Sequence, residues 1–231
     1  MEKIILIETS TALCSTAIAE SGEITSYRES SAPKAHASLT AVFIQEMLSE
    51  RGMTLADCDA VCVSMGPGSY TGLRVGVSTA KGLCFGSKKP LLAVGTLDIL
   101  VAQAKGETTA PEGGFKYVIP MIDARRMEVY TAVFSPEGQQ LTKTAPAIID
   151  ETSFSEYLEQ GPVLFIGDGA GKCADVIKHQ NAHFVQCNPK ASAMLAPATE
   201  TLKAEKIQDV AYFEPFYLKE FVATVSKKKL F

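Results

Sequence analysis

Two acidic residues stand where strands are predicted to end, one in each half of the chain. Glu8 follows the apolar run Ile4–Ile7, and Asp123 follows the apolar run Tyr117–Ile122. A carboxylate at such a position can hold Mg²⁺ or activate water in a phosphotransferase. It can also cap a turn, because the three hydroxyl residues after Glu8 can hydrogen-bond locally. Both interpretations remain open for Glu8, whereas the turn cap is favoured for Asp123.

A glycine-rich segment, GPGSYTGLRVGVSTAKGL at residues 66–83, follows a predicted strand and opens a predicted helix, as phosphate-binding loops do. It matches neither a P-loop nor G-x-G-x-x-G, because Gly72 falls one position late. Pro67 also has no N–H to offer a phosphate. We therefore expect no resident cofactor and at most weak nucleotide binding. The candidate nucleotide contacts are Glu8, Thr9, Ser10, Gly167, Asp168 and Gly169.

The cysteines and histidines predict no metal site. None of the six cysteines forms a C-x-x-C pair, and buried reduced thiols are their expected state. His36 lies near a predicted helix start, where packing at the helix end is its expected role. His179 and His183 are four residues apart, but the residues between them predict a turn rather than a helix.

The hydrophobic pattern that must position these residues repeats. In the first half it predicts strands at 4–7, 15–20, 24–27, 60–65 and 91–94 and helices at 36–51, 71–85 and 97–105. In the second half it predicts strands at 117–122, 128–134, 147–149 and 163–166 and helices at 154–159 and 169–178. The matches, at offsets of 115, 115 and 116, are Ile7-Glu8 with Ile122-Asp123, Thr16–Ile18 with Thr131–Val133, and Gly22 with Gly138.

The repeat indicates duplication of a strand–strand–strand–helix–strand–helix (βββαβα) unit. The polar, Gly- and Pro-containing segment 106–114 is the best candidate for a linker between the two copies. We therefore predict an α/β protein with an N-terminal lobe at 1–105, a second, smaller lobe at 106–231 and a cleft between them. A helix near 193–206 is a candidate to cross back to the first lobe.

The predicted helix at 71–85 carries a strip of small residues, Gly72, Gly76 and Ala80. Each interior glycine costs a helix roughly 1 kcal/mol relative to alanine, which close packing should offset. The closely packed partner could be the 36–51 helix or a helix of another subunit. Because the 36–51 helix has apolar residues on more than one face, we predict a protein interface. Its candidate residues are Leu39, Phe43, Met47, Gly72, Val75, Gly76, Thr79 and Ala80.

Composition limits the remaining possibilities. The 231 residues carry 22 basic and 26 acidic side chains, a formal charge of −4, which argues against autonomous nucleic-acid binding. The lysines at 227–229 are more simply explained as a solvated terminus. The apolar run at the start is too short for a signal peptide, and no run approaches the length of a membrane span. A cytoplasmic protein without membrane association is expected.

Four segments resemble one known family nearly end to end, the TsaB (YeaZ) family. They are ILIETSTALCSTAIAESGEI, GPGSYTGLRVGVSTAKGL, IDARRMEVYTAVF and IGDGA. The resemblance implies the two-lobed actin-like ATPase fold (ASKHA, ribonuclease H-like) found in sugar kinases and Hsp70. It also implies dimerisation through the N-terminal lobe, as a homodimer when the chain is alone.

The family resemblance further implies an accessory, non-catalytic subunit. Such a subunit acts with the catalytic paralog TsaD and the ATPase TsaE in adding threonylcarbamoyl to A37 of tRNA, and contacts tRNA only indirectly. The paralog carries a metal-binding H-x-x-x-H helix, whose positions here are Thr96 and Leu100. No catalytic residue is therefore expected. The alternative is an enzyme in its own right, either an actin-fold ATPase or kinase or the metalloprotease (M22 glycoprotease) once named for this family.

Overall fold

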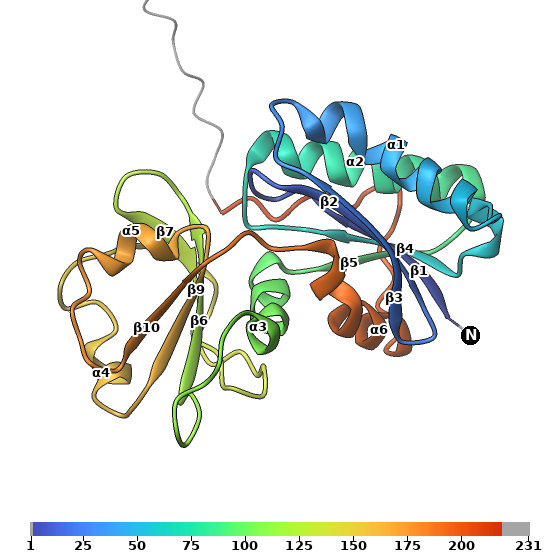
Figure 1. Cartoon of the computed structure of the whole chain (residues 1–231). Helices are drawn as coiled ribbons and strands as arrows, with labels where there is room; N and C mark the ends of the chain where they lie inside the picture. Colours follow the sequence, from blue (N-terminus) through green and yellow to red (C-terminus); the bar gives the residue numbers. More distant parts are fainter. Residues whose placement is uncertain (1, 219–231) are drawn as a thin grey trace, which may run out of the picture.

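The apolar runs of the first half form a five-stranded mixed sheet in a computed structural model that describes residues 2–218 (Figure 1). The strand order is β3-β2-β1-β4-β5, with β1 antiparallel to β2 and parallel to β4. The strands are β1 (Lys3–Glu8), β2 (Cys14–Glu20), β3 (Glu23–Ser30), β4 (Ala60–Ser64) and β5 (Leu91–Val94). The helices of this half are α1 (Ala35–Glu50), the short η1 (Leu55–Asp57), α2 (Tyr70–Ser87) and α3 (Thr96–Glu107).

The second half forms a sheet with the same topology. Its order is β8-β7-β6-β9-β10, and its parallel and antiparallel pairs fall in the same places. The strands are β6 (Tyr117–Asp123), β7 (Glu128–Thr131), β8 (Ala145–Ile148), β9 (Val163–Gly167) and β10 (Ala182–Gln186). The helices are α4 (Ser155–Leu158), α5 (Ala170–Ala174), η2 (Ala191–Met194) and α6 (Leu195–Lys203). The identical order confirms the predicted duplication.

The matched glycines occupy equivalent turns. Gly22 has φ +85° between β2 and β3, and Gly138 has φ +101° in the turn after β7. Both are left-handed conformations that glycine adopts without steric cost. The tight turns bring the next chain segment back beside its neighbour, as the matched spacing predicts.

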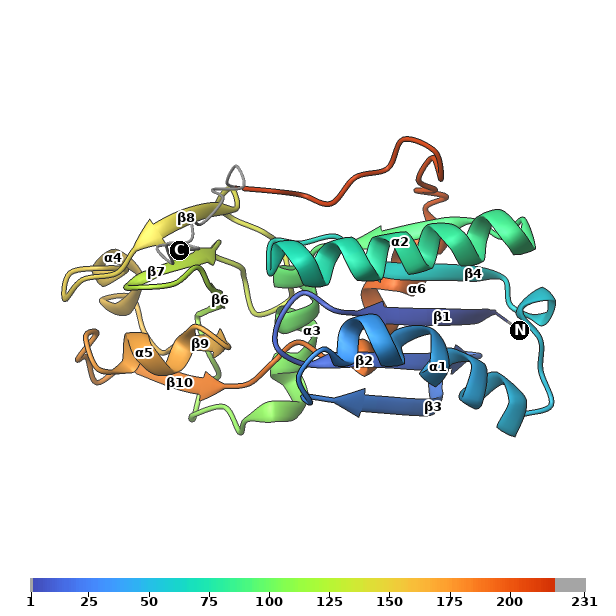
Figure 2. The same cartoon turned by 90° about the horizontal axis from the view of Figure 1, so that it is seen from above.

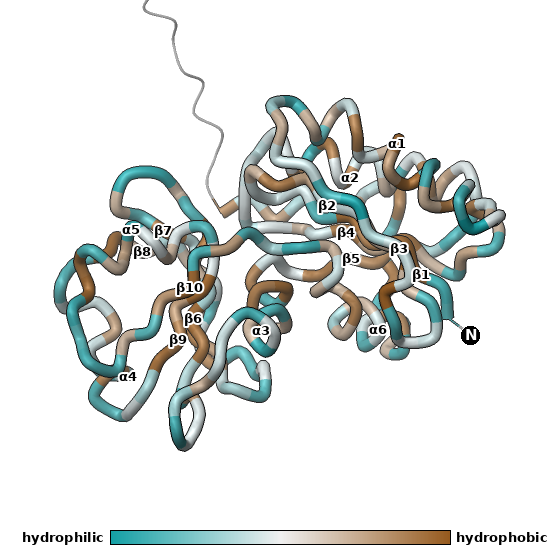
Figure 3. The backbone as a smooth tube through the Cα atoms, viewed as in Figure 1, coloured by the Kyte–Doolittle hydropathy of each residue, from teal (hydrophilic) through white to brown (hydrophobic). Residues whose placement is uncertain are grey.

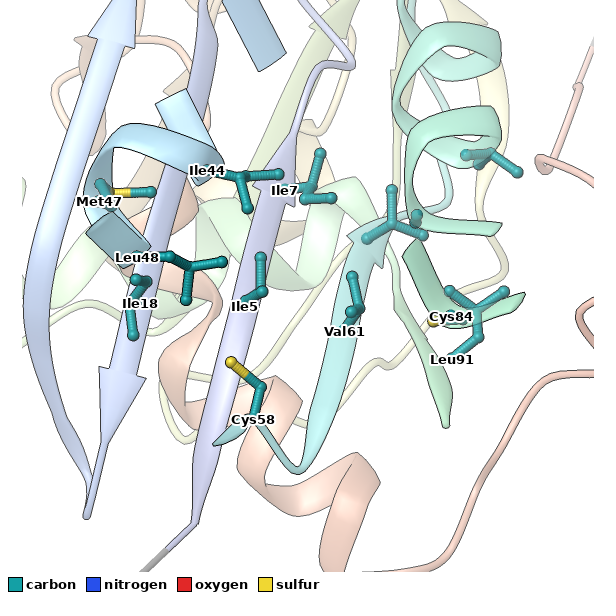
Figure 4. Packing of buried hydrophobic residues seen from close by; sticks show 13 residues of the cluster. Ile5, Ile7, Ile18, Ile44, Met47, Leu48, Cys58, Val61, Cys84 and Leu91 are labelled. Carbon is teal, nitrogen blue, oxygen red and sulfur yellow. The ribbon is translucent and has the colours of Figure 1, made fainter. Parts of the chain in front are cut away.

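Helices α1 and α2 lie side by side over one face of the first sheet (Figure 2). Hydropathy follows this layering: apolar residues concentrate along the strands, and polar ones in the turns (Figure 3). Ile44, Met47 and Leu48 of α1 meet Ile5 and Ile7 of β1 in a continuous buried cluster (Figure 4). At about 25 cal/mol per Å² of apolar surface, such burial is the main force that fixes both helices on the sheet.

The opposite faces of the two sheets are covered by helices that have exchanged places. Helix α3 follows the first sheet in sequence, yet Leu97, Leu100 and Val101 pack with β6 and β9 of the second. Helix α6 follows the second sheet, yet Ala198 packs with β1, β4 and β5 of the first, together with Met194 of η2. Only Ile99 of α3 faces the first sheet. The predicted helix near 193–206 thus lies on the first lobe.

Beyond α6 the chain runs along the side of α2 that faces away from α1 (Figure 2). We call residues 209–217 the strap. The ammonium group of Lys81 donates hydrogen bonds of 3.1 Å to the carbonyl oxygens of Ala211 and Phe213. The N–H of Phe216 donates to the carbonyl oxygen of Met65 at 2.7 Å. These bonds bring the strap's end to the gap between the lobes.

The structure corrects the interpretation of the small residues in α2. An added Cβ at Gly72 would overlap the carbonyl oxygen of Thr9, and one at Gly76 would overlap the Thr9 hydroxyl. The close backbone is therefore the loop after β1 of the same chain, not a second helix. Met47 and Ala80 are also fully buried within the lobe. These four residues are not available to a partner.

Within residues 2–218, no helix combines the length and the apolar character that crossing a bilayer requires.

Candidate functional site

A cleft of about 640 Å³ lies between the two lobes. The first lobe contributes the loop after β1 and the start of α2, and the second lobe contributes the β6–β7 turn and Asp168. The last side chains of the strap also line the cleft. The lining residues that the following paragraphs use are Ser10, Thr11, His36, Tyr70, Asp123, Arg125, Tyr130, Asp168, Phe216 and Tyr217.

Glu8 lies under the cleft rather than in it. Its side chain is completely buried, and its Oε1 accepts the N–H of Ser10 at 2.5 Å. Its Oε2 has no hydrogen-bond partner among the described residues. Burial raises the pKa of Glu8 to about 7, against the lowering effect of the hydrogen bonds from Ser10 and Ser64. Glu8 thus caps the loop after β1, which is the structural alternative for this residue.

Asp123 caps the equivalent turn in the second lobe. Its Oδ1 accepts the N–H of Arg125 at 2.7 Å and the ammonium group of Lys172 at 2.6 Å. Lys172 also donates to the carbonyl oxygens of Arg126 and Glu128, both at 2.7 Å. All three donors of one ammonium group therefore fix the turn between β6 and β7.

That turn holds two consecutive arginines in the left-handed region, Arg125 at φ +70° and Arg126 at φ +50°. The left-handed conformation costs a residue with a Cβ roughly 1 kcal/mol or more. The bonds from Lys172 and Asp123 hold the backbone there, and both arginine side chains remain exposed. The sequence predictions assigned no role to this turn, although two adjacent arginines beginning two residues after Asp123 were a visible signal.

The residues of the second lobe that were predicted to contact a nucleotide fall into two groups. Asp168 lines the cleft, accepts the N–H of Asp123 at 2.9 Å, and has its pKa raised to about 6 by burial. The neighbouring glycines are used for packing inside the lobe. An added Cβ at Gly167 would overlap the carbonyl oxygen of Met121, and one at Gly169 would press on Val129. Neither glycine makes room for a ligand.

An aromatic group lies where α2, the strap and the cleft meet. The rings of Tyr70 and Tyr217 have centroids 4.8 Å apart. The guanidinium group of Arg74 lies 4.3 Å from the centroid of Tyr70 and hydrogen-bonds the Tyr217 side chain. On the other side, His36 Nε2 lies 2.9 Å from the carbonyl oxygen of Thr11, so this histidine packs at the start of α1 as expected.

The two positions that would correspond to metal ligands are inside the protein. Thr96 begins α3, Leu100 follows one turn later, and both are fully buried. Across residues 2–218, no three His, Cys, Asp or Glu side chains gather in a way that could hold a metal ion. The lysines at 227–229 lie outside the described residues.

The other predicted interface residues lie at the outer surface of the α1–α2 pair. Leu39 and Phe43 of α1 and Val75 and Thr79 of α2 are all half-buried. Val42 and Phe85 on the same helices are exposed apolar side chains, 40% and 83% accessible. The surface is therefore present, and its use by a partner stays a prediction.

Two copies of one five-stranded unit, joined across a cleft, define a two-lobed α/β protein of the actin-like type. Comparison with solved structures agrees with this class. A Pseudomonas aeruginosa protein described as similar to peptidase YeaZ matches with a TM-score of 0.83 and 26% identity, over 95% of this chain and all of that one. YeaZ from Pseudomonas aeruginosa matches with a TM-score of 0.81 and 26% identity, over 94% of this chain and all of that one.

Sequence comparison gives the family. Residues 29–227 match the TsaD family model, tRNA N6-adenosine threonylcarbamoyltransferase. The Escherichia coli K12 protein TsaB, a tRNA threonylcarbamoyladenosine biosynthesis protein, is 29% identical over 96% of both chains. TsaB of Haemophilus influenzae is 38% identical over 55% of this chain and 51% of its own. The chain therefore belongs to the TsaD family, in the branch of the TsaB (YeaZ) proteins.

Proposed function

We propose that this protein is an accessory, non-catalytic subunit in the synthesis of threonylcarbamoyladenosine in tRNA. The full-length likeness to a protein named for this biosynthesis is the observation that carries the pathway. The catalytic step is assigned to a TsaD-like paralog, and a TsaE-like ATPase completes the set of partners. The two loops that face the cleft support the proposal that this subunit is not catalytic.

Several backbone N–H groups of the two loops are already bonded within the chain. After β1, the N–H of Ser10 donates to Glu8 Oε1. After β6, the N–H of Asp123 donates to Asp168, that of Ala124 to Glu128, and that of Arg125 to Asp123. Phosphate-binding loops use such donors on the ligand instead.

The carboxylates of the cleft also oppose a nucleotide. Asp123 and Asp168 line it, and Glu8 lies beneath them. A triphosphate brought here would meet acidic groups where phosphate-binding proteins place glycines and lysine. Without a bound cation these carboxylates would repel a triphosphate, which supports the proposal that the protein has no nucleotide-dependent activity of its own.

The metal chemistry of the catalytic paralog does not fit either. Threonine is a poor ligand and leucine is none, so Thr96 and Leu100 cannot reproduce a pair of histidines. Both are enclosed by the packing of α3 between the lobes. Enzyme activity in isolation is therefore not part of the proposal.

The partner surface is assigned to α1 and α2. Helix α2 carries Gly82 and Gly86 on its exposed side, where a Cβ added to either glycine would have no neighbour within 4 Å. Phe85 of the same helix turn is an exposed apolar side chain. Unlike Gly72 and Gly76, these glycines are not explained by packing within the chain. They suit close approach by a helix of a second copy or of the TsaD-like paralog.

The association test uses tagged full-length protein to capture the paralog. Val42→Glu and Phe85→Glu should each lower capture by about tenfold or more, because a buried charge opposes an apolar contact. Ile148→Glu is the matched control, since Ile148 is 78% exposed but lies on β8 of the other lobe. Undiminished capture by both α1 and α2 variants would contradict the assigned surface.

The pathway is tested in cells depleted of the protein. Mass spectrometry of their tRNA should show loss of threonylcarbamoyladenosine, and normal levels would refute the role. Calorimetric titration of the isolated protein with ATP or zinc addresses the enzyme alternative. Micromolar binding of either would favour a nucleotide- or metal-dependent activity of its own.

A further inference from the structure

The β6–β7 turn is built to hold two arginines outward. Its backbone is fixed by three bonds from Lys172 and by the bond between the Arg125 N–H and Asp123 Oδ1. Both arginines are held at positive φ, a conformation that glycine would adopt without steric cost. The proposed accessory role, which rests on other residues, leaves this strained pair unexplained.

The two guanidinium groups are without partners in the part of the chain that the structure describes. Among the ion pairs and hydrogen bonds there, only backbone atoms of Arg125 and Arg126 take part, and neither guanidinium group does. The acidic group closest on the turn, Asp123, is already paired with Lys172. The turn thus presents two adjacent exposed cations on a backbone that is fixed by hydrogen bonds.

Aromatic side chains line the same cleft as Arg125. Arg125 lines the same cleft as Tyr130 of β7, and the strap brings Phe216 and Tyr217 to that cleft. Phe216 is 40% exposed. Cations on a fixed turn next to aromatic rings are the combination by which proteins bind unpaired nucleic acid, with phosphates on the cations and bases on the rings.

We propose that the Arg125–Arg126 turn binds the phosphodiester backbone of an unpaired tRNA segment, whose bases lie against the aromatic side chains at the mouth of the cleft. This inference rests on the proposed role in tRNA modification. It adds a direct contact where the family resemblance implies only an indirect one. An acidic protein segment would use the arginines but not the rings, so RNA is the better match. The net charge of −4 means that such binding depends on this local site.

The test measures binding of fluorescent, unmodified tRNA by anisotropy, with the full chain alone and with its TsaD-like paralog. The double variant Arg125→Gly/Arg126→Gly removes both cations and suits the positive φ angles, so it should fold at least as well as the parent. Its tRNA affinity should fall about fivefold or more at 0.1 M salt. The slope of log affinity against log salt should shrink by roughly 1.4, because two phosphate contacts to an unpaired strand are lost at about 0.7 each.

Lys143→Ala/Lys178→Ala is the matched control, since it removes two exposed cations from the same lobe. It should leave the affinity within about twofold of the parent, and Arg125→Lys/Arg126→Lys should keep most of the salt slope. An unchanged affinity of the glycine variant, an equal loss in the control, or no tRNA binding in either setting overturns the proposal. So does a loss of paralog binding with tRNA affinity retained, which would assign the turn to a protein. The modification level in depleted cells tests the accessory role separately.

Discussion

Glu8, the last residue of β1, is a buried carboxylic acid beneath the cleft. The side chain that closes β1 is enclosed by the lobe, with one oxygen bonded to Ser10 and the other unpartnered among the described residues. A carboxylate in that position is costly to ionise, because burial removes its hydration. It is therefore better described as a structural acid than as a ligand for Mg²⁺.

Replacement of Glu8 by glutamine should remove a loss of stability that occurs as pH rises. Burial raises the Glu8 pKa from 4.5 to about 7, so the folded protein retains a proton that the unfolded chain releases between these values. The free energy of unfolding contributed by this group is thus greatest below pH 4.5. It falls as pH rises to 7, by on the order of 3 kcal/mol. Glu8→Gln should exceed the parent in stability at pH 8 and approach it at pH 5.

Urea unfolding at the two pH values checks this expectation. Glu46→Gln on the exposed face of α1 is the control for loss of one acidic side chain. An advantage of Glu8→Gln that is equal at pH 5 and pH 8 would contradict the proton-linked explanation.

At the scale of elements, α2 carries two kinds of glycine. Gly72 and Gly76 receive the loop after β1, whereas Gly82 and Gly86 face open space. The same residue type therefore serves internal packing at one end of the helix and remains available for contact at the other. The hydrophobic pattern could locate the helix, but it could not tell which backbone approaches which glycine.

Substitution by alanine at these two kinds of site should change the free energy of unfolding in opposite directions. Gly72→Ala would overlap the carbonyl oxygen of Thr9 and should lower the free energy of unfolding by about 1–3 kcal/mol. Gly82→Ala meets no neighbour and should raise it by up to about 1 kcal/mol through helix propensity. Chemical denaturation of both variants decides the matter, and destabilisation by Gly82→Ala would show an internal contact that the fold does not display.

The elements predicted from sequence were those whose periodicity is local. Both long helices over the first sheet, the strands of the first sheet, four of the five strands of the second and the repeated turns follow from spacing alone, whereas β10 was not predicted. The second-lobe helices are shorter than predicted, since α5 ends at Ala174 rather than near Lys178. The site could be predicted less well, because Ser10, Arg125 and Tyr217 come to line one cleft only through long-range packing.

At the scale of the whole molecule, the exchange of α3 and α6 ties the lobes together. Gln103 of α3 donates to the carbonyl oxygen of Asn188 and accepts the N–H of Lys190, both within 3.0 Å. The hydroxyl of Ser15 accepts the N–H of Ala191 at 2.9 Å. The returning chain is thereby fixed to both lobes, and each lobe depends on residues from the other half of the sequence. The sequence made the α6 helix a candidate to cross back, but no local pattern specified that α3 packs on the second sheet.

A residue of the second half should therefore control the stability of the first lobe. Met194→Ala removes a fully buried side chain from the cluster around β1 and β4, and should cost about 2–5 kcal/mol. Hydrogen exchange should show the greatest loss of protection in those strands. Met121→Ala, in the core of the second sheet, is the counterpart. The expectation fails if both variants loosen only the second lobe.

The exchanged helices also bear on what happens when the chain is cut. A break within 108–116 leaves each fragment with one bare sheet face and one helix shaped for the other fragment. Each fragment produced alone should lack a cooperative unfolding transition, because it is not stably folded. Co-expression of the two fragments should reconstitute the folded protein by complementation. Complementation would be detected by capturing one fragment through a tag on the other and recording the circular dichroism of the captured complex. Each half of the sequence therefore needs the other half in order to fold, independently of any other subunit.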